Sequence, residues 1–251
     1  MAKAPFAHGG FGEVYSAKWR EGYIVVVKVI KANGDKEKQA VWCEANLTLR
    51  LNHPNVIKLF GVTCVTHDQL GIVMEKAEHG SLDTWVGEID HEKLTKIALG
   101  IIDGLEYVHS QKVIHRDIKP KNILMFGAKD DMIPKIADFG VAKLIQTYTA
   151  HSRVGQELYM APEVRLDLPY SFTADIFSLA MMLFEMFNEQ LLSHASEEVS
   201  RFILQMHSGE SSAIPRSCKV PVHLRNVIER GWNRNPDERP TLSEYNSTLQ
   251  G

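Results

Sequence analysis

The sequence has 251 residues, a formal net charge of -3 at pH 7 and 44% hydrophobic residues, enough to build a large core in one domain or two lobes. The charge balance disfavours the broad positive field that nucleic acid or an anionic membrane attracts, so we expect no nucleic-acid partner. Cys43, Cys64 and Cys218 are odd in number and lack metal-ligand spacing, which favours a reducing compartment. We therefore expect a cytoplasmic protein without a signal peptide or membrane segment.

The first third of the chain is predicted to form a small sheet with one helix. Runs rich in β-branched residues at 23–30, 56–65 and 70–74 predict strands, and the charged interval 36–51 predicts a helix. The short, polar, glycine-bearing stretch at 76–81 then predicts a hinge.

The remainder is predicted to be mainly helical. Apolar residues recur at three- and four-residue steps from His91 to Ser110, which predicts an amphipathic helix with one buried face. The segment 176–187 is apolar almost all round, so we expect it inside the core. Further amphipathic helices are expected near 199–206, 222–230 and 242–249.

A glycine-rich segment near the N-terminus precedes a strand that carries a lysine. Glycines in a turn between strands let backbone N–H groups approach phosphate oxygens, and Lys28 on the next strand can neutralise phosphate charge. A simple hairpin turn is the alternative interpretation of the glycines. An ammonium in an apolar strand needs an acidic partner, for which Glu44 is the natural candidate. The phosphate-binding residues would be Gly9, Gly10, Phe11 and Gly12.

Three motifs follow in a specific order: H-R-D-I-K-P-K-N at 115–122, D-F-G at 138–140 and A-P-E at 161–163. Together with the glycine loop and Lys28, they make the sequence resemble the eukaryotic protein kinase family. The resemblance extends over nearly the whole chain, since 175–178 and 235–240 match the family's late helical motifs.

The resemblance implies an α+β fold with two lobes and ATP in the cleft between them. Residues 1–251 would form one protein kinase domain, with a β-rich N-lobe at 1–76 and the hinge and helical C-lobe at 77–251. ATP and Mg²⁺ would be the cofactors, and proteins with serine or threonine acceptors the substrates.

The resemblance also assigns roles to polar residues. Asp117 would orient the acceptor hydroxyl and take its proton, while Lys119 would reach the γ-phosphate. Asn122 and Asp138 would hold Mg²⁺ through oxygen ligands. Lys28, paired with Glu44, would also contact the nucleotide. Adenine would lie in a pocket in which Met74 is the gatekeeper. The pocket residues would be Val14, Val26, Met74, Glu75, Ala77 and Leu124.

Lys119 after the H-R-D triplet is typical of serine/threonine kinases, and segments 53–61 and 74–82 resemble the tyrosine-kinase-like group, which includes mixed-lineage and receptor-interacting kinases. Gln156 stands where serine/threonine kinases usually have threonine, which leaves tyrosine or dual specificity open. Phosphorylation of the activation loop is expected to raise activity by pairing a phosphate with Arg116. The candidate acceptors in that loop are Thr147, Tyr148, Thr149 and Ser152.

Other interpretations stay open at this point. Each aspartate alone could cap a turn or accept backbone N–H bonds, and His115 is expected to be a packed core residue. Glu163 and Arg239 are expected to form a structural ion pair. A pseudokinase scaffold with little turnover and a small-molecule phosphotransferase are the competing functions.

Overall fold

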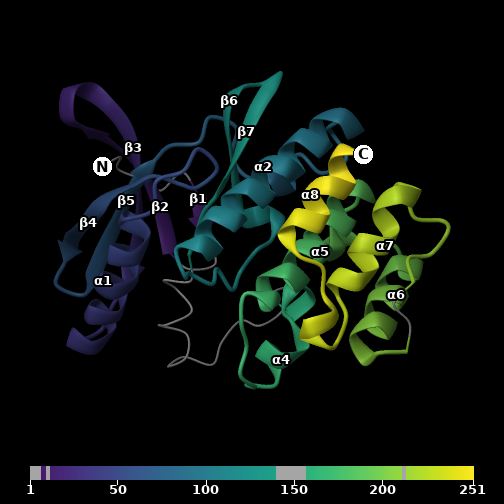
Figure 1. Cartoon of the computed structure of the whole chain (residues 1–251). Helices are drawn as coiled ribbons and strands as arrows, with labels where there is room; N and C mark the ends of the chain where they lie inside the picture. The colour runs from purple at the N-terminus through teal and green to yellow at the C-terminus, as the bar shows by residue number, and fades with distance from the viewer. Residues whose placement is uncertain (1–6, 10–11, 140–156, 211–212) are drawn as a thin grey trace.

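A five-stranded antiparallel sheet forms the first part of the chain (Figure 1). The structure is a computed structural model that describes residues 7–9, 12–139, 157–210 and 213–251. The strand order is β1-β2-β3-β5-β4, and helix α1 packs against the sheet. The bounds are β1 Ala7–Gly9, β2 Gly12–Trp19, β3 Tyr23–Lys31, α1 Asp35–Leu49, β4 Leu59–Thr66 and β5 Gln69–Glu75.

Strand β3 lies in the middle of the sheet, between β2 and β5. Six consecutive residues, Val25 to Ile30, are buried, so both faces of the strand are covered. This continuous run of valine and isoleucine suits a strand packed on both sides. Lys28 is the exception in the run, and its ammonium must be satisfied inside this environment.

The strand predicted at 56–65 begins later, at Leu59. Residues before it cross to the other part of the chain instead: Ile57 N–H donates to the carbonyl of Ile136 at 2.9 Å, and Ile136 N–H donates to Asn55 at 2.9 Å. Val56 forms a parallel bridge with Ile136. The apolar run is therefore divided between two sheets, which its pattern alone did not reveal.

Helices dominate the second part of the chain, as predicted. Their bounds are α2 His91–Ser110, α4 Pro162–Arg165, α5 Thr173–Phe187, α6 Glu197–Ser208, α7 Val222–Gly231 and α8 Leu242–Gln250. Short 3₁₀ turns occur at η1 Arg20–Gly22, η2 Leu82–Thr84, η3 Pro120–Asn122, η4 Glu157–Tyr159, η5 Leu192–His194 and η6 Pro236–Glu238. Within the described ranges, none of the helices combines the length and the apolar character needed to cross a bilayer.

Helix α5 forms the centre of the helical part. Every residue from Ala174 to Phe187 is buried, which confirms the prediction of a core helix. Three of these buried residues are polar or charged, namely Asp175, Ser178 and Glu185. Because buried polar groups are costly unless they are bonded, each of them marks a specific contact.

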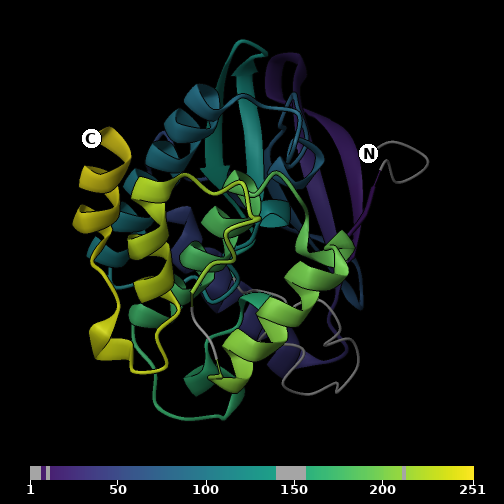
Figure 2. The ribbon, with the colours of Figure 1, turned by 90° about the vertical axis from the view of Figure 1, so that its right-hand side faces the viewer.

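The segment predicted to be a hinge lies beside a small second sheet. Strands β6 Ile123–Ala128 and β7 Asp131–Ile136 form a hairpin between the N-terminal strands and α2 (Figures 1 and 2). Met125 N–H donates to Gly80 at 2.8 Å, and His79 N–H donates to Met125 at 3.1 Å. Residues 76–81 therefore run along β6, although a division of the chain at residue 76 stays a prediction.

Tyr245 on α8 is an unsatisfied group in the packed helical core. Its side chain is fully buried, and its hydroxyl has no hydrogen-bond partner among the described residues. Gly231 leaves the space for it, since a Cβ atom added there would lie 1.9 Å from the tyrosine hydroxyl. Burial raises the pKa of Tyr245 because the phenolate would lose its hydration.

We predict that Tyr245→Phe is neutral or stabilising by about 1 kcal/mol, because it removes a buried hydroxyl that forms no bond. The matched control is Tyr159→Phe, which removes a hydroxyl that donates to Glu185 and should lower stability. Urea unfolding of both variants measures the difference. A loss above about 1 kcal/mol for Tyr245→Phe would contradict the assignment.

Candidate active site

The segment 115–117 is anchored by one buried carboxylate. Asp175, in the first turn of α5, is fully buried, and its two oxygens accept the backbone N–H groups of His115 and Arg116 at 2.8 Å each. The Nε2 atom of His109 lies 2.8 Å from the same carboxylate. Arg116 has a φ of 69°, a left-handed conformation that side chains disfavour, and the two N–H bonds stabilise it.

Asp117 lies at the centre of a buried polar cluster. Its Oδ2 atom is 2.9 Å from Nζ of Lys119 and accepts a 2.7 Å hydrogen bond from Nδ2 of Asn122. The same amide nitrogen donates to the backbone carbonyl of Asp117 at 2.7 Å. Turn η3 places Asn122 at this position, and all three side chains are buried. The structure thus brings the three predicted catalytic residues together.

A second cluster joins the sheet to the helical part. Nζ of Lys28, on β3, lies 2.7 Å from Oδ1 of Asp138, although the two residues are 110 positions apart. Lys28 is 8% exposed as a residue, so its ammonium is paired in a largely buried setting. The partner predicted for it, Glu44, lies on α1, and its side chain is outside the described part of the chain. That pairing stays a prediction, while the pairing with Asp138 is an additional contact.

His115 links the two clusters. Its Nδ1 atom accepts the N–H of Asp117 at 3.2 Å, and its Nε2 atom lies 3.0 Å from the carbonyl of Ala137. The neutral tautomer with hydrogen on Nε2 satisfies both contacts. The ring is fully buried and packs edge-on against Phe139, with centroids 4.8 Å apart. His115 is thus a packed core residue, as expected, and it holds the loops of Asp117 and Asp138 in register.

The apolar residues predicted to surround adenine lie on β2, β3, β5 and β6 and just after β5. Val26 on β3 is paired with Met74 on β5, and both are buried. Val14, Ala77 and Leu124 are partly buried against the same core. Gly9 and Gly12 pair across β1 and β2, as expected for a turn between these strands.

Several predicted residues lie outside the described part of the chain. They are Gly10 and Phe11 of the glycine turn, and Thr147, Tyr148, Thr149, Ser152 and Gln156 of the predicted activation loop.

Comparison with known proteins decides the family. Residues 4–248 match the protein kinase domain family. The chain belongs to the protein kinase family. The geometry agrees with this family match, because residues from the family's characteristic motifs form the two clusters described above.

The kinase domain is similar to several curated relatives. Serine/threonine/tyrosine-protein kinase HT1 of Arabidopsis thaliana is 30% identical over 257 residues, which cover 98% of this chain and 64% of the relative. Serine/threonine-protein kinase 10 of Xenopus tropicalis is 32% identical, with 94% and 26% covered. Tyrosine protein-kinase src-1 of Caenorhabditis elegans is 28% identical, with 96% and 46% covered. The chain spans less than two thirds of the length of these relatives. The match to HT1 is consistent with the predicted tyrosine-kinase-like group.

The kinase domain has further anchors that the motifs did not predict. The side chain of Glu75, at the end of β5, accepts the N–H of Lys58 at 2.8 Å and contacts Nζ of Lys135, on β7, at 2.8 Å through each oxygen. This ion pair joins the hinge end of the sheet to the β6–β7 hairpin.

The expected ion pair of Glu163 with Arg239 is present and buried, with contacts of 2.5 and 2.8 Å.

The segment before Glu163 is fixed by helix α5. The hydroxyl of Tyr159 donates to the carboxyl of Glu185, and the carbonyl of Tyr159 accepts a 2.7 Å bond from Ser178. Glu185 also accepts the N–H of Leu192 at 2.8 Å. Two buried polar residues of α5 thus hold the end of the predicted activation segment. Ser178 belongs to the motif at 175–178, whereas no sequence motif included Glu185.

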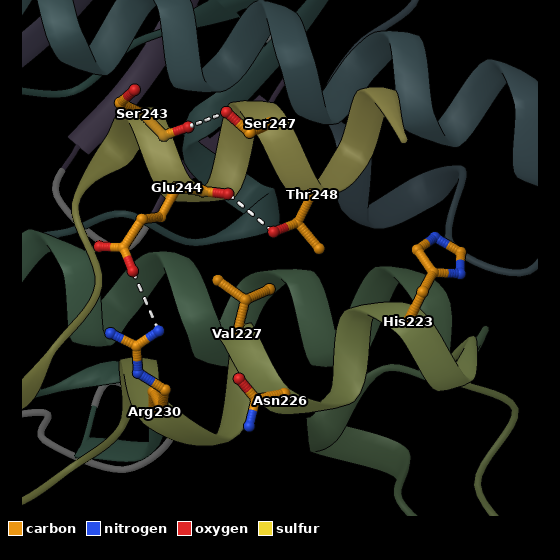
Figure 3. Close-up of a pocket in the computed structure, with 8 residues that line it drawn as sticks. All are labelled: His223, Asn226, Val227, Arg230, Ser243, Glu244, Ser247 and Thr248. Atoms are coloured by element: carbon orange, nitrogen blue, oxygen red, sulfur yellow. Dashed lines mark hydrogen bonds and ion pairs between the residues drawn. The ribbon is translucent and has the colours of Figure 1, made fainter.

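A separate cavity of about 280 Å³ lies between α7 and α8 (Figure 3). Arg230 and Glu244 form a 3.0 Å ion pair at one end, and the hydroxyls of Ser247 and Thr248 donate to carbonyls of their own helix. Four of its polar side chains are therefore bonded within the two helices. None of the predicted site residues is among those that line it: His223, Asn226, Val227, Arg230, Ser243, Glu244, Ser247 and Thr248.

We predict that Asp175→Asn lowers both stability and turnover, because an amide nitrogen would replace one oxygen that accepts a backbone N–H. The loss of a buried, bonded carboxylate should cost about 2 kcal/mol or more and slow peptide phosphorylation. Denaturant unfolding and steady-state kinetics measure the two effects. The control is Asp103→Asn, at an exposed carboxylate 3.3 Å from Asn246. Equal effects in both variants would contradict the anchoring role.

Glu185 should make stability depend on pH. Burial raises its pKa from 4.5 to about 7, although the bonds from Tyr159 and Leu192 favour the charged form, and nearby Asp83 raises the pKa further. Between these values the folded protein keeps a proton that the unfolded chain releases, so the free energy of unfolding falls as pH rises. We predict that Glu185→Gln gains about 3 kcal/mol relative to the parent between about pH 5 and about pH 8. Urea unfolding of the parent and the variant across this pH range measures the effect. An equal change of the free energy of unfolding with pH in both proteins would contradict the prediction.

Proposed function

We propose that this chain is the catalytic domain of an ATP-dependent protein kinase that transfers the γ-phosphoryl group to serine and threonine hydroxyls. The observation that carries the proposal is the presence of two charged clusters: Lys28 of β3 with Asp138, and Asp117 with Lys119 and Asn122. A fold alone would not support an activity, whereas these side chains supply the groups that phosphoryl transfer needs.

The nucleotide would bind between the sheet and the β6–β7 hairpin. Val14, Val26 and Leu124 would pack against adenine below the gatekeeper Met74. The N–H of Glu75 donates to Lys58, so Glu75 would contribute its carbonyl oxygen to adenine, and Ala77 its N–H. Lys28 would neutralise the α- and β-phosphates, with the backbone of the turn that contains Gly9, Gly10, Phe11 and Gly12 above them.

The donor atoms fit a divalent cation, for which Mg²⁺ is our proposal. Asp138 offers a carboxylate that is 32% exposed in its side chain, and Asn122 uses its amide nitrogen to bond Asp117, so its amide oxygen would be the ligand. Hard cations prefer such oxygen atoms and share their remaining positions with phosphate and water. The bound ion would neutralise charge on the β- and γ-phosphate oxygens.

Asp117 would orient the acceptor hydroxyl and receive its proton. The new bond forms between the acceptor oxygen and the γ-phosphorus, and the bond from that phosphorus to the bridging oxygen of ADP breaks. Lys119, 2.9 Å from Asp117, would place positive charge beside the transferred group. Asn122 fixes the Asp117 carboxylate from the other side, so the base is held before substrate arrives.

Serine and threonine are the proposed acceptors because Lys119 occupies the position typical of that class, and because relatives with serine/threonine-kinase names match over nearly the whole chain. Dual specificity is the runner-up, supported by the name of the first relative above.

We also propose regulation through a phosphate on Thr147, Tyr148, Thr149 or Ser152 that pairs with exposed Arg116, and a cytoplasmic location. The three cysteines are free thiols, which suits a reducing compartment.

We predict that Asp117→Asn lowers the rate of phosphate transfer from γ-labelled ATP to a serine/threonine peptide library by about 100-fold or more, because the general base is lost. ATP binding should persist. The control is Asp130→Asn, at a carboxylate with 98% exposure in the turn between β6 and β7, which should retain full activity. Absence of transfer by the parent, or an unchanged rate in Asp117→Asn, would support a pseudokinase scaffold instead.

A further inference from the structure

Three large apolar side chains stand exposed in the short loop between α4 and α5. Leu166, Leu168 and Tyr170 are 67%, 51% and 38% exposed, and they occupy alternate positions in five residues. Single exposed apolar residues are ordinary, but a contiguous group is typical of a binding surface. We call these three residues the 166–170 surface.

The backbone beneath this surface is fixed in place. Leu166 N–H donates to Pro162 at 3.0 Å, and Leu168 N–H donates to the carbonyl of Glu163 at 2.9 Å. Glu163 is itself held by its buried ion pair with Arg239. A partner that binds here would therefore meet a backbone that is already fixed, which lowers the entropic cost of binding.

One contact connects this surface to the segment that carries Asp117. The guanidinium of Arg116 lies 5.5 Å from the ring centroid of Tyr170, and Arg116 directly precedes Asp117 in the chain. On the opposite side, Arg165 lies 3.5 Å from His207 of α6. An acceptor polypeptide that places its hydroxyl at Asp117 would therefore have the 166–170 surface beside its path.

We propose that the 166–170 surface binds an apolar side chain of the protein substrate, such as leucine, isoleucine or phenylalanine, located several residues from the phosphorylated hydroxyl. The proposal rests on the proposed kinase function and adds a preference among its substrates. Continuity with the acceptor site favours a substrate segment over a second copy of this chain. Among the described residues, no contact connects the exposed aromatic side chains of the sheet, Trp19, Tyr23 and Phe60, to the Asp117 cluster.

The test uses a double variant that carries both Leu166→Ser and Leu168→Ser. Its substrates are a peptide library in which each peptide has one serine acceptor and one apolar residue, placed in turn at each position before and after that serine. The control is the double variant Tyr23→Ser with Ile24→Ser, at residues of β3 that are 73% and 53% exposed. The parent should prefer an apolar residue at one position. The first variant should raise the KM for that peptide about tenfold, the effect of losing one buried apolar contact. The KM for ATP and the rate with a peptide that lacks the apolar residue should stay unchanged.

Fluorescence anisotropy with the preferred peptide, labelled and carrying alanine in place of the acceptor, measures binding without turnover. Equal affinity for the parent and the Leu166/Leu168 variant would overturn the proposal, as would equal losses in the control. A change from dimer to monomer in sedimentation, with peptide KM unchanged, would assign the surface to self-association and also overturn it. Transfer by the parent without any apolar preference would overturn this inference alone, whereas absence of transfer to every peptide would overturn the proposed function as well.

Discussion

A buried ammonium needs a nearby negative charge, and this requirement ties the two parts of the kinase domain together. Lys28 lies in the most buried strand of the sheet, and its 2.7 Å contact with Asp138 crosses to a loop that follows the β6–β7 hairpin. Asp138 has a φ of 64°, so the backbone adopts an unfavourable conformation that presents its carboxylate there. The other contacts of the site hold Lys28, Asp138 and the Asp117 cluster close to one another.

Rigid support comes from the helical core. The carboxylate of Asp175 fixes the backbone before Asp117, and His115 connects that loop to the residue before Asp138. Farther out, Glu185 and Ser178 secure Tyr159. Each support is a buried polar group whose loss would leave a donor or acceptor unsatisfied. Asp175, Ser178 and Glu185 lie in α5, whereas His115 lies in the loop that it supports.

Much of this arrangement could be predicted, because periodicity and motif order depend on local sequence. Helix α2 has the bounds that its apolar pattern indicates, and α5 is buried as its composition requires. The strand predicted from residue 56 was wrong at its start, since pairing of Val56 with Ile136 depends on a partner 80 residues away. The contact of Lys28 with Asp138 and the role of Asp175 were missed for the same reason. Charge requirements showed that Lys28 needs a partner, but only three-dimensional proximity reveals which carboxylates are within reach.

The central claim is that Lys28 and Asp138 form one binding site for a metal-bound nucleotide. Calorimetric titration of ATP into the parent and Asp138→Asn, each with and without Mg²⁺, tests it most directly. The account predicts that Mg²⁺ tightens ATP binding to the parent by about tenfold or more and has little effect on the variant. Equal enhancement by Mg²⁺ in both proteins, or no ATP binding by the parent, would contradict it.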